Sequence, residues 1–166
     1  MNTPSIVMVL SDFTKFTVRC ENGWTMFRNG CYKVFREKKE WNEAKNTCEQ
    51  DCGPVGSTCG QLTSIHSQDE TDFIRCQQTD ANQGRPDTVH TTWVGGQRTN
   101  NGFRWIDGTA FDYDNWYTNQ PDNQGGNEDC LQVHSNPGQD WHDKWSDAAC
   151  DEKRNFVCKK KPLGGT

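Results

Sequence analysis

The sequence predicts a disulfide-bonded α+β fold, and three observations support this prediction. Two helical patterns come early in the chain and are followed by several short strands with long loops between them, an order typical of α+β proteins. Nine cysteines indicate an oxidising compartment. Seven Trp and eight Phe supply large apolar surfaces where aliphatic side chains are few. A chain of 166 residues fits one domain with a core of useful size.

Cysteines in such number could also hold zinc, but no tight Cys-x-x-Cys pair occurs. We therefore expect disulfides and a secreted, extracellular protein. The apolar run Ile6–Leu10 is too short for the core of a signal sequence or for a membrane span, which indicates a mature or trimmed chain. A net charge of −5 and the lack of a basic stripe argue against nucleic acid as a partner.

The first structured segment is expected to be a hairpin. Residues 1–19 are weakly patterned and form a predicted N-terminal extension. Cys20 and Cys31 then frame a segment with two Asn-Gly pairs, which favour the backbone angles of tight hairpin turns. A local disulfide across this hairpin suits the ten-residue gap, and residues 32–35 continue as a strand.

Residues 39–50 are predicted to form a helix. Trp41, Ala44 and Cys48 recur at helical spacing and therefore share one face. A cysteine on that buried face should tie the helix to a distant element of the chain.

A loop rich in Gly and Pro follows this helix and is bracketed by Cys52 and Cys59. These two cysteines either close a small ring, or one of them pairs elsewhere. A second helix is predicted from Ser67 to Gln78. Ser67 and Glu70 have the spacing of a capping box, in which the serine oxygen accepts from a helix amide and the glutamate reaches back.

The second half of the chain is expected to be built of strands and loops. Residues 79–90 form a predicted polar loop, and short strands are predicted at residues 91–96, 102–108, 131–134 and 156–159. Three tryptophans lie on these strands or at strand ends, and we expect them in the core: Trp93, Trp105 and Trp116.

One stretch of this second half is strongly acidic. Between Asp107 and Glu152 there are eleven Asp or Glu residues and a single lysine, Lys144. A negative field of this strength repels itself unless solvent or a bound cation relieves it. A solvated acidic face is the simpler alternative, because most charge clusters are of that kind.

Several motifs together resemble the C-type lectin domain. They are CY at 31–32, LTSIHS at 62–67, WVGG at 93–96, and then WIDG, QPDNQGGNEDC, WSDAAC and FVCK. The resemblance covers residues 20–160 and leaves a short tail at 161–166. It implies the double-loop α+β fold, with two helices and two small antiparallel sheets.

The resemblance also implies three disulfides: Cys48–Cys158, Cys130–Cys150, and Cys20–Cys31, which marks the long form of the domain. The family pattern has no fixed cysteine at 52 or 59, so a Cys52–Cys59 bond is our own inference. Because nine is odd, Cys76 stands outside these four bonds and is a candidate for a disulfide-linked dimer.

The resemblance implies a Ca²⁺ site in the acidic stretch. Gln120 and Asp122 flank Pro121, and a cis bond before the proline would turn both side chains to one side. Glu128 and Asp147 match the remaining ligands. Calcium prefers six to eight oxygens, so two positions stay open for vicinal sugar hydroxyls. Within the family, Gln-Pro-Asp resembles the motif of members that bind galactose or N-acetylgalactosamine.

Two positions depart from the family pattern. Ser146 stands where the family usually has an asparagine ligand, and we retain it as a predicted metal and sugar contact. No tryptophan follows Gln-Pro-Asp to stack on the sugar, so Trp141 and His142 are the candidate replacements. An auxiliary calcium site is not expected, because residues 97–102 hold no carboxylate.

We therefore predict a calcium-dependent carbohydrate-binding domain without catalysis, which recognises glycans on glycoproteins or cell surfaces. The main alternative is a domain of the same fold that binds a protein without calcium or sugar. An enzyme using Glu128 and Asp129 as acid and base is disfavoured, because we expect Asp129 to brace the loop. The predicted sugar contacts are Gln120, Asp122, Glu128, Trp141, His142 and Ser146.

Overall fold

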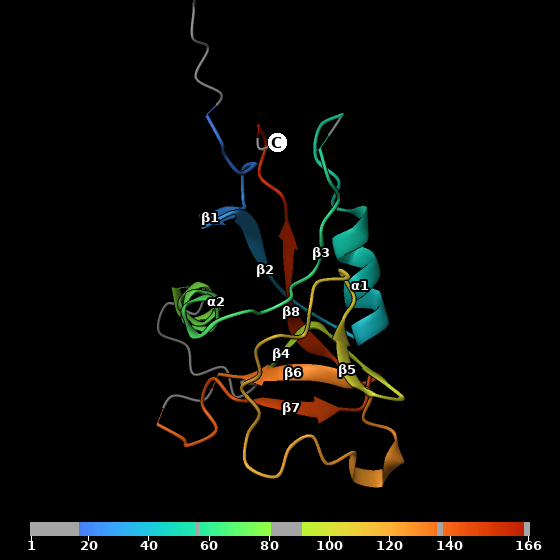
Figure 1. Cartoon of the computed structure of the whole chain (residues 1–166). Coiled ribbons are helices and arrows are strands. Elements are labelled where there is room, and N and C mark those ends of the chain that lie inside the picture. Colours follow the sequence, from blue (N-terminus) through green and yellow to red (C-terminus); the bar gives the residue numbers. More distant parts are fainter. Residues whose placement is uncertain (1–16, 56, 81–90, 136–137, 165–166) are drawn as a thin grey trace, which may run out of the picture.

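The computed structural model describes residues 17–55, 57–80, 91–135 and 138–164 (Figure 1). The predicted α+β class is confirmed. The helices are α1 (Trp41–Gln50) and α2 (Gln68–Asp80), and the loop before β6 contains a 3-10 turn, η1 (Gln124–Gly126). The strands of the described residues are β1 (Thr25–Phe27), β2 (Gly30–Lys39), β3 (Gln61–Leu62), β4 (Thr91–Thr99), β5 (Gly102–Trp105), β6 (Cys130–His134), β7 (Trp145–Ala148) and β8 (Arg154–Lys160).

Four predicted segments fall partly outside these described ranges. The parts outside are residues 1–16 of the N-terminal extension, residue 56 of the loop after the first helix, residues 81–90 of the polar loop, and residues 165–166 of the C-terminal tail. Arg19 and Leu163 pair through their backbones at 3.2 and 2.8 Å, which brings together the first and last segments of the described residues. No helix of the described part is long and apolar enough to cross a membrane.

The strands form two antiparallel groups that are joined into one mixed sheet. One group contains β1, β2, β3 and β8, and the other contains β4, β5, β6 and β7. A short parallel pairing, Thr92 with Asn155 and Trp93 with Phe156, connects β4 to β8. This pairing joins the two small antiparallel sheets of the prediction into a continuous sheet in the order β1-β2-β8-β4-β6-β7, with β3 and β5 on its branches.

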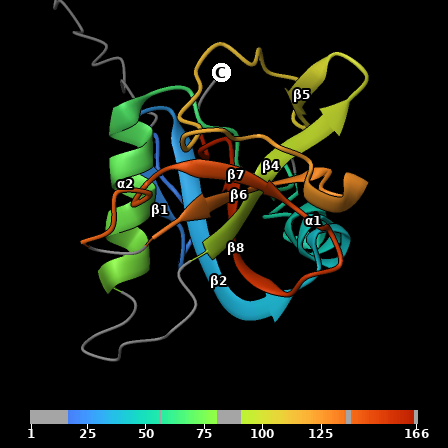
Figure 2. The same cartoon turned by 90° about the horizontal axis from the view of Figure 1, so that it is seen from below.

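The helices lie on opposite sides of the β2–β8 pair (Figures 1 and 2). Helix α1 begins at Trp41, two residues later than predicted, because β2 continues to Lys39, where it pairs with Arg154. Glu40 is extended and caps the helix together with Glu43. As predicted, Trp41, Ala44 and Cys48 are buried on one face.

Helix α2 begins after Ser67, whose Oγ accepts from the Glu70 amide at 3.3 Å. The other half of the predicted capping box differs. The Glu70 carboxylate accepts from the His66 amide at 2.8 Å instead of the Ser67 amide. Glu70 is only 5% exposed, and it also accepts from Tyr32 and, at 2.7 Å, from Lys159, which supplies the charge that a buried carboxylate requires.

Four disulfides hold these elements together, and all four were expected: Cys20–Cys31, Cys48–Cys158, Cys52–Cys59 and Cys130–Cys150. The Cys48–Cys158 bond ties α1 to β8, as the buried position of Cys48 had indicated. Cys76 is exposed on α2 and stands outside these four bonds.

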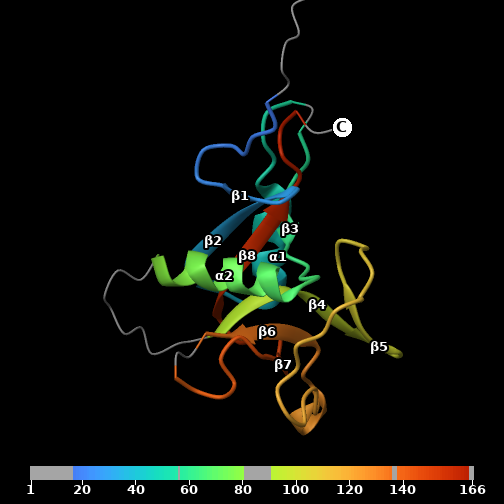
Figure 3. The same ribbon diagram turned by 60° about the vertical axis from the view of Figure 1, so that its left-hand side comes forward.

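The core is dominated by aromatic rings. Trp93 and Trp105 are 0% and 2% exposed, as expected for core residues. Trp116 is half-buried and packs edge-to-face against Trp145 with ring centroids 5.8 Å apart, so it covers the core instead of lying within it. The long loop between β5 and β6, whose course Figure 3 shows, contacts this core through the rings of Phe111 and Trp116, which meet Trp145.

Candidate metal centre

Three carboxylates of the acidic stretch come together on the loop between β5 and β6 and on strand β7. Asp122 is exposed, Glu128 is half-buried and Asp147 is buried, and one oxygen of each lies within 4.8 Å of the others. Figures 1 and 3 show that η1, which lies between Asp122 and Glu128, is at the end of the molecule opposite the C-terminus. Each of these residues was predicted as a metal ligand, and the fold brings them together.

The Gln120–Pro121 peptide is cis, as the resemblance implied. Asn119 and Asn123 on either side adopt left-handed backbone angles, with φ of 65° and 49°, a conformation that asparagine tolerates better than most residues. In this turn the Gln120 side-chain oxygen Oε1 is buried, and no described residue donates a hydrogen bond to it. A buried amide oxygen without a donor is unfavourable, and a cation is one way to satisfy it.

Backbone amides hold the carboxylates in place. Asp147 accepts from the amides of Asp122 at 3.1 Å and Asn123 at 2.8 Å. Glu128 Oε2 accepts from the Gln124 amide at 2.8 Å, and the Asn123 side chain accepts from the Glu128 amide at 3.0 Å. The loop therefore orients these oxygens through its own backbone.

The cluster is under electrostatic strain. Burial raises the pKa of Glu128, and the negative charges of Asp147 and Asp122 raise it further, although the hydrogen bond from Gln124 opposes this. A carboxyl group whose pKa is raised by two neighbouring carboxylates is in an arrangement that a divalent cation would relieve.

Arg98 of β4 supplies a positive charge that the sequence did not reveal. Its guanidinium pairs with the fully buried carboxylate of Asp147, its Nε donates to the Glu128 carbonyl at 2.9 Å, and Nε lies 3.4 Å from Asp129. Asp129 thus contacts Arg98 and is not one of the three clustered carboxylates, in keeping with the expected bracing role.

A cavity of about 300 Å³ opens over the cluster. Trp141 lines it and meets Tyr117 edge-to-face at 6.2 Å, whereas His142 is not among its lining residues and lies 3.4 Å from Asp143. The cavity is lined by Tyr117, Gln120, Asp122, Gln124, Glu128, Gln132, His134, Trp141, Ser146 and Asp147.

Ser146 lies in the same cavity, but its hydroxyl is already engaged. Ser146 Oγ accepts from Gln132 Nε2 at 2.8 Å and lies 2.9 Å from His134 Nε2. Gln132 and His134 were not predicted as site residues. The alternation of β6 could have found them, since Leu131 and Val133 enter the core while the residues between and after them face the other way.

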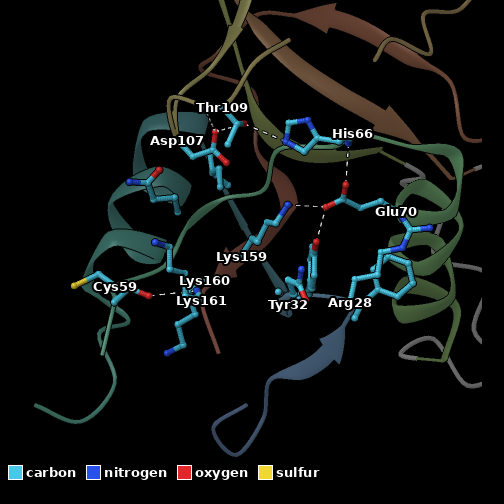
Figure 4. Close-up of a pocket in the computed structure, with 16 residues that line it drawn as sticks. Arg28, Tyr32, Cys59, His66, Glu70, Asp107, Thr109, Lys159, Lys160 and Lys161 are labelled. Atoms are coloured by element: carbon cyan, nitrogen blue, oxygen red, sulfur yellow. Dashed lines mark hydrogen bonds and ion pairs between the residues drawn. The ribbon is translucent and has the colours of Figure 1, made fainter. Parts of the chain in front are cut away.

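A second and larger cavity, of about 580 Å³, lies between the β1–β2 hairpin, α2 and β8 (Figure 4). Figure 4 shows Glu70 pointing toward Tyr32 and Lys159. Burial, followed by the Glu70 charge, raises the pKa of Tyr32 far above its ordinary value. In this cavity the Glu70 carboxylate and the Lys159 ammonium offset each other's charge.

At the edge of this cavity, one histidine lies at hydrogen-bonding distance from a serine and an aspartate, as in a catalytic triad. His66 Nε2 lies 3.0 Å from Ser64 Oγ, and His66 Nδ1 lies 2.8 Å from Asp112, a contact that lowers the pKa of Asp112. Ser64, however, is fully buried and donates its proton to Asp107 at 2.5 Å. It cannot present a nucleophile to a substrate. His66 instead forms hydrogen bonds at the turn into α2.

Comparison with known proteins identifies the family. Residues 37–160 match the family model described as the Lectin C-type domain. The chain is 35% identical over 148 residues to C-type lectin lectoxin-Lio1 of Erythrolamprus poecilogyrus, covering 88% of this chain and 83% of that one. The solved structure of C-type lectin CEL-I of Cucumaria echinata matches with a TM-score of 0.71 at 26% identity, covering 86% of this chain and 97% of that chain.

Herring type II antifreeze protein has a similar structure, with a TM-score of 0.68 at 27% identity, covering 87% of this chain and 99% of that chain. The fold thus occurs in proteins named for sugar binding and in a protein named for another activity. Family model, relatives and structures agree, and this chain belongs to the C-type lectin domain family.

Proposed function

We propose that this protein is a calcium-dependent carbohydrate-binding lectin that prefers galactose or N-acetylgalactosamine. The observation that carries the proposal is the buried Gln120 Oε1, which lacks a donor among the described residues and lines one cavity with three mutually repelling carboxylates. Neutral and anionic oxygens in this combination are the ligands that calcium prefers. An acidic cluster alone would not require a cation, whereas the orphaned amide oxygen supports one.

In this proposal the ion is held by Gln120 Oε1 and by the carboxylates of Asp122, Glu128 and Asp147. Calcium, when bound, supplies open coordination positions for two vicinal sugar hydroxyls. The carboxylates of Asp122 and Glu128 accept hydrogen bonds from those hydroxyls, and the Gln120 amide nitrogen donates. This order of donor and acceptor is the basis for the proposed preference for galactose-type sugars.

Two further side chains contribute to the sugar site. Trp141 lines the cavity and offers an aromatic face for the apolar side of a sugar ring. The Ser146 hydroxyl would have to give up a hydrogen bond to Gln132 or His134 before it could bind the ion. We therefore assign Ser146 to the sugar side of the cavity and propose Trp141, instead of His142, as the stacking platform.

We also propose that the protein acts outside the cell on glycans of glycoproteins or cell surfaces. Four disulfides support this location, because they persist in oxidising compartments.

Retention on galactose-agarose tests the proposal. The protein should be retained in millimolar CaCl2 and eluted by excess EDTA. Asp122→Asn should not be retained, whereas Asp114→Asn, which removes an equal charge from an exposed residue outside the cavity, should behave as the wild type. Retention of the wild type in excess EDTA would rule out a calcium-dependent mechanism.

One observation favours a second candidate, a domain that binds a protein without calcium or sugar. The Arg98 guanidinium already neutralises the buried carboxylate of Asp147, so part of the cluster is satisfied by the chain itself. Calorimetric titration separates the candidates, because a calcium-independent protein binder gives no heat with CaCl2.

A further inference from the structure

Gln132, on β6, is a buried polar side chain that lines the cavity over the carboxylate cluster. It is 7% exposed, lines the same cavity as the carboxylates, and is paired with Ser146 on strand β7. Strands β6 and β7 lie side by side in Figures 1 and 2. Its Nε2 donates to Ser146 Oγ at 2.8 Å. Its Oε1 is buried, and no described residue donates to it.

The Gln132 amide nitrogen is held by the Ser146 hydroxyl. Ser146 Oγ accepts from Gln132 and also contacts His134 Nε2 at 2.9 Å, so a continuous chain of polar contacts links the three residues. Since the amide nitrogen is used in this chain, the amide oxygen remains as an acceptor. A buried acceptor of this kind gains more from an incoming donor than an exposed one, which already bonds to water.

The size of the cavity indicates what that donor is. Its volume of about 300 Å³ is roughly ten times the ~30 Å³ that one water molecule occupies in the liquid. An ion fills only a small part of this space. The remainder, which Trp141 and Gln132 help to line, can hold a sugar ring whose hydroxyls are hydrogen-bond donors.

We propose that Gln132 Oε1 accepts a hydrogen bond from a sugar hydroxyl other than the two on the ion, and so determines sugar specificity. The inference rests on the proposed calcium-dependent lectin function. In it, Gln120 and the carboxylates hold the ion, while Gln132, oriented by Ser146, reads a third hydroxyl of a galactose-type sugar.

The test separates calcium binding from sugar binding in Gln132→Met, which keeps the length of the side chain and removes the amide. Calorimetry first measures the affinity for CaCl2 and then the affinity for galactose at saturating calcium. The calcium affinity should stay within about twofold, and the galactose affinity should fall about tenfold, the effect of one lost hydrogen bond. Gln132→Glu, which retains an acceptor, should recover galactose binding and provides a second reading should the methionine variant fail to fold.

Gln61→Met is the matched control. Gln61 Oε1 is also buried without a donor among the described residues, but it lines the larger cavity, so both affinities should be unchanged. A series of monodeoxy-galactoses then identifies the hydroxyl. One of them should bind the wild type about tenfold more weakly than galactose and bind Gln132→Met no more weakly than galactose does.

Three results would overturn the inference in distinguishable ways. An equal loss of calcium and galactose affinity in Gln132→Met would make Gln132 a metal ligand. Unchanged galactose affinity would make it a structural residue. A wild-type protein that binds neither CaCl2 nor galactose would overturn the proposed function itself.

Discussion

Replacing Glu128 by Gln should have opposite effects on the calcium-free and the calcium-loaded protein. In the calcium-free state, the Glu128 carboxylate faces two others within 4.8 Å. Two unit charges at this distance repel by about 0.9 kcal/mol in water. Two such pairs, screened by physiological salt, amount to about 1 kcal/mol. Glutamine keeps the acceptor for the Gln124 amide, so Glu128→Gln should stabilise the calcium-free protein by about 1 kcal/mol.

In the calcium-loaded protein, Glu128→Gln should be destabilising instead. Losing one anionic ligand at a calcium–oxygen distance of about 2.4 Å should cost about 2–3 kcal/mol of binding free energy, or roughly 30- to 150-fold in affinity. At a calcium concentration of about 100 times the wild-type dissociation constant, the wild type gains about 2.7 kcal/mol of stability. The variant, bound about a hundredfold more weakly, gains about 0.4 kcal/mol.

Thermal unfolding in EDTA and in CaCl2 measures both effects. For a domain of this size about 1 kcal/mol corresponds to roughly 2–4 °C, so calcium should raise Tm by roughly 5–11 °C in the wild type and by about 1 °C in Glu128→Gln. Glu37→Gln, on an exposed part of β2, removes the same charge outside the cluster and should behave as the wild type. An equal calcium-induced shift in wild type and Glu128→Gln would refute the assignment of Glu128 as a ligand.

Three further predictions concern Arg98, the pH dependence of sugar retention, and Cys76. Arg98→Gln should destabilise the calcium-free protein by about 2 kcal/mol, because the buried carboxylate of Asp147 loses its partner, and urea unfolding should show that CaCl2 restores most of this loss. Sugar retention should fall on acidification. Calcium needs the ionised carboxylate, and the pKa of Glu128 is raised, so retention is complete well above that pKa and is lost as the pH falls through it; a flat pH profile of column retention would contradict this. Non-reducing electrophoresis should show a dimer that Cys76→Ser abolishes, whereas identical monomer bands would exclude a disulfide link through this exposed position.

Local patterns predicted the helices, and the resemblance to the family implied the candidate ligand set. Trp41, Ala44 and Cys48 lie one turn apart, so their common buried face follows from helical geometry alone. Gln120 and Asp122 are neighbours across one proline, and Glu128 follows within the same loop, so their proximity depends on few long-range contacts. Asp147 is the distant member, and only the resemblance to the family connected it to the others.

The contacts that the sequence did not predict depend on how strands far apart in the chain align with one another. Arg98 and Asp147 are 49 residues apart, and their ion pair depends on how β4, β6 and β7 align in the sheet. Gln132 faces Ser146 for the same reason, since a shift of one residue would turn its side chain to the other side of the sheet. The parallel pairing of β4 with β8 covers two residue pairs, which is too short to leave a pattern in the sequence.

The central claim is that the carboxylate cluster and Gln120 form a calcium site. The most direct test is a calorimetric titration with CaCl2 of protein that has been stripped with EDTA and dialysed free of the chelator. The account predicts saturable binding of one calcium ion per chain, and this binding is lost in Asp147→Asn. Galactose should bind to the wild type only when calcium is present. A titration without saturable heat, or one that is unchanged in Asp147→Asn, would contradict it.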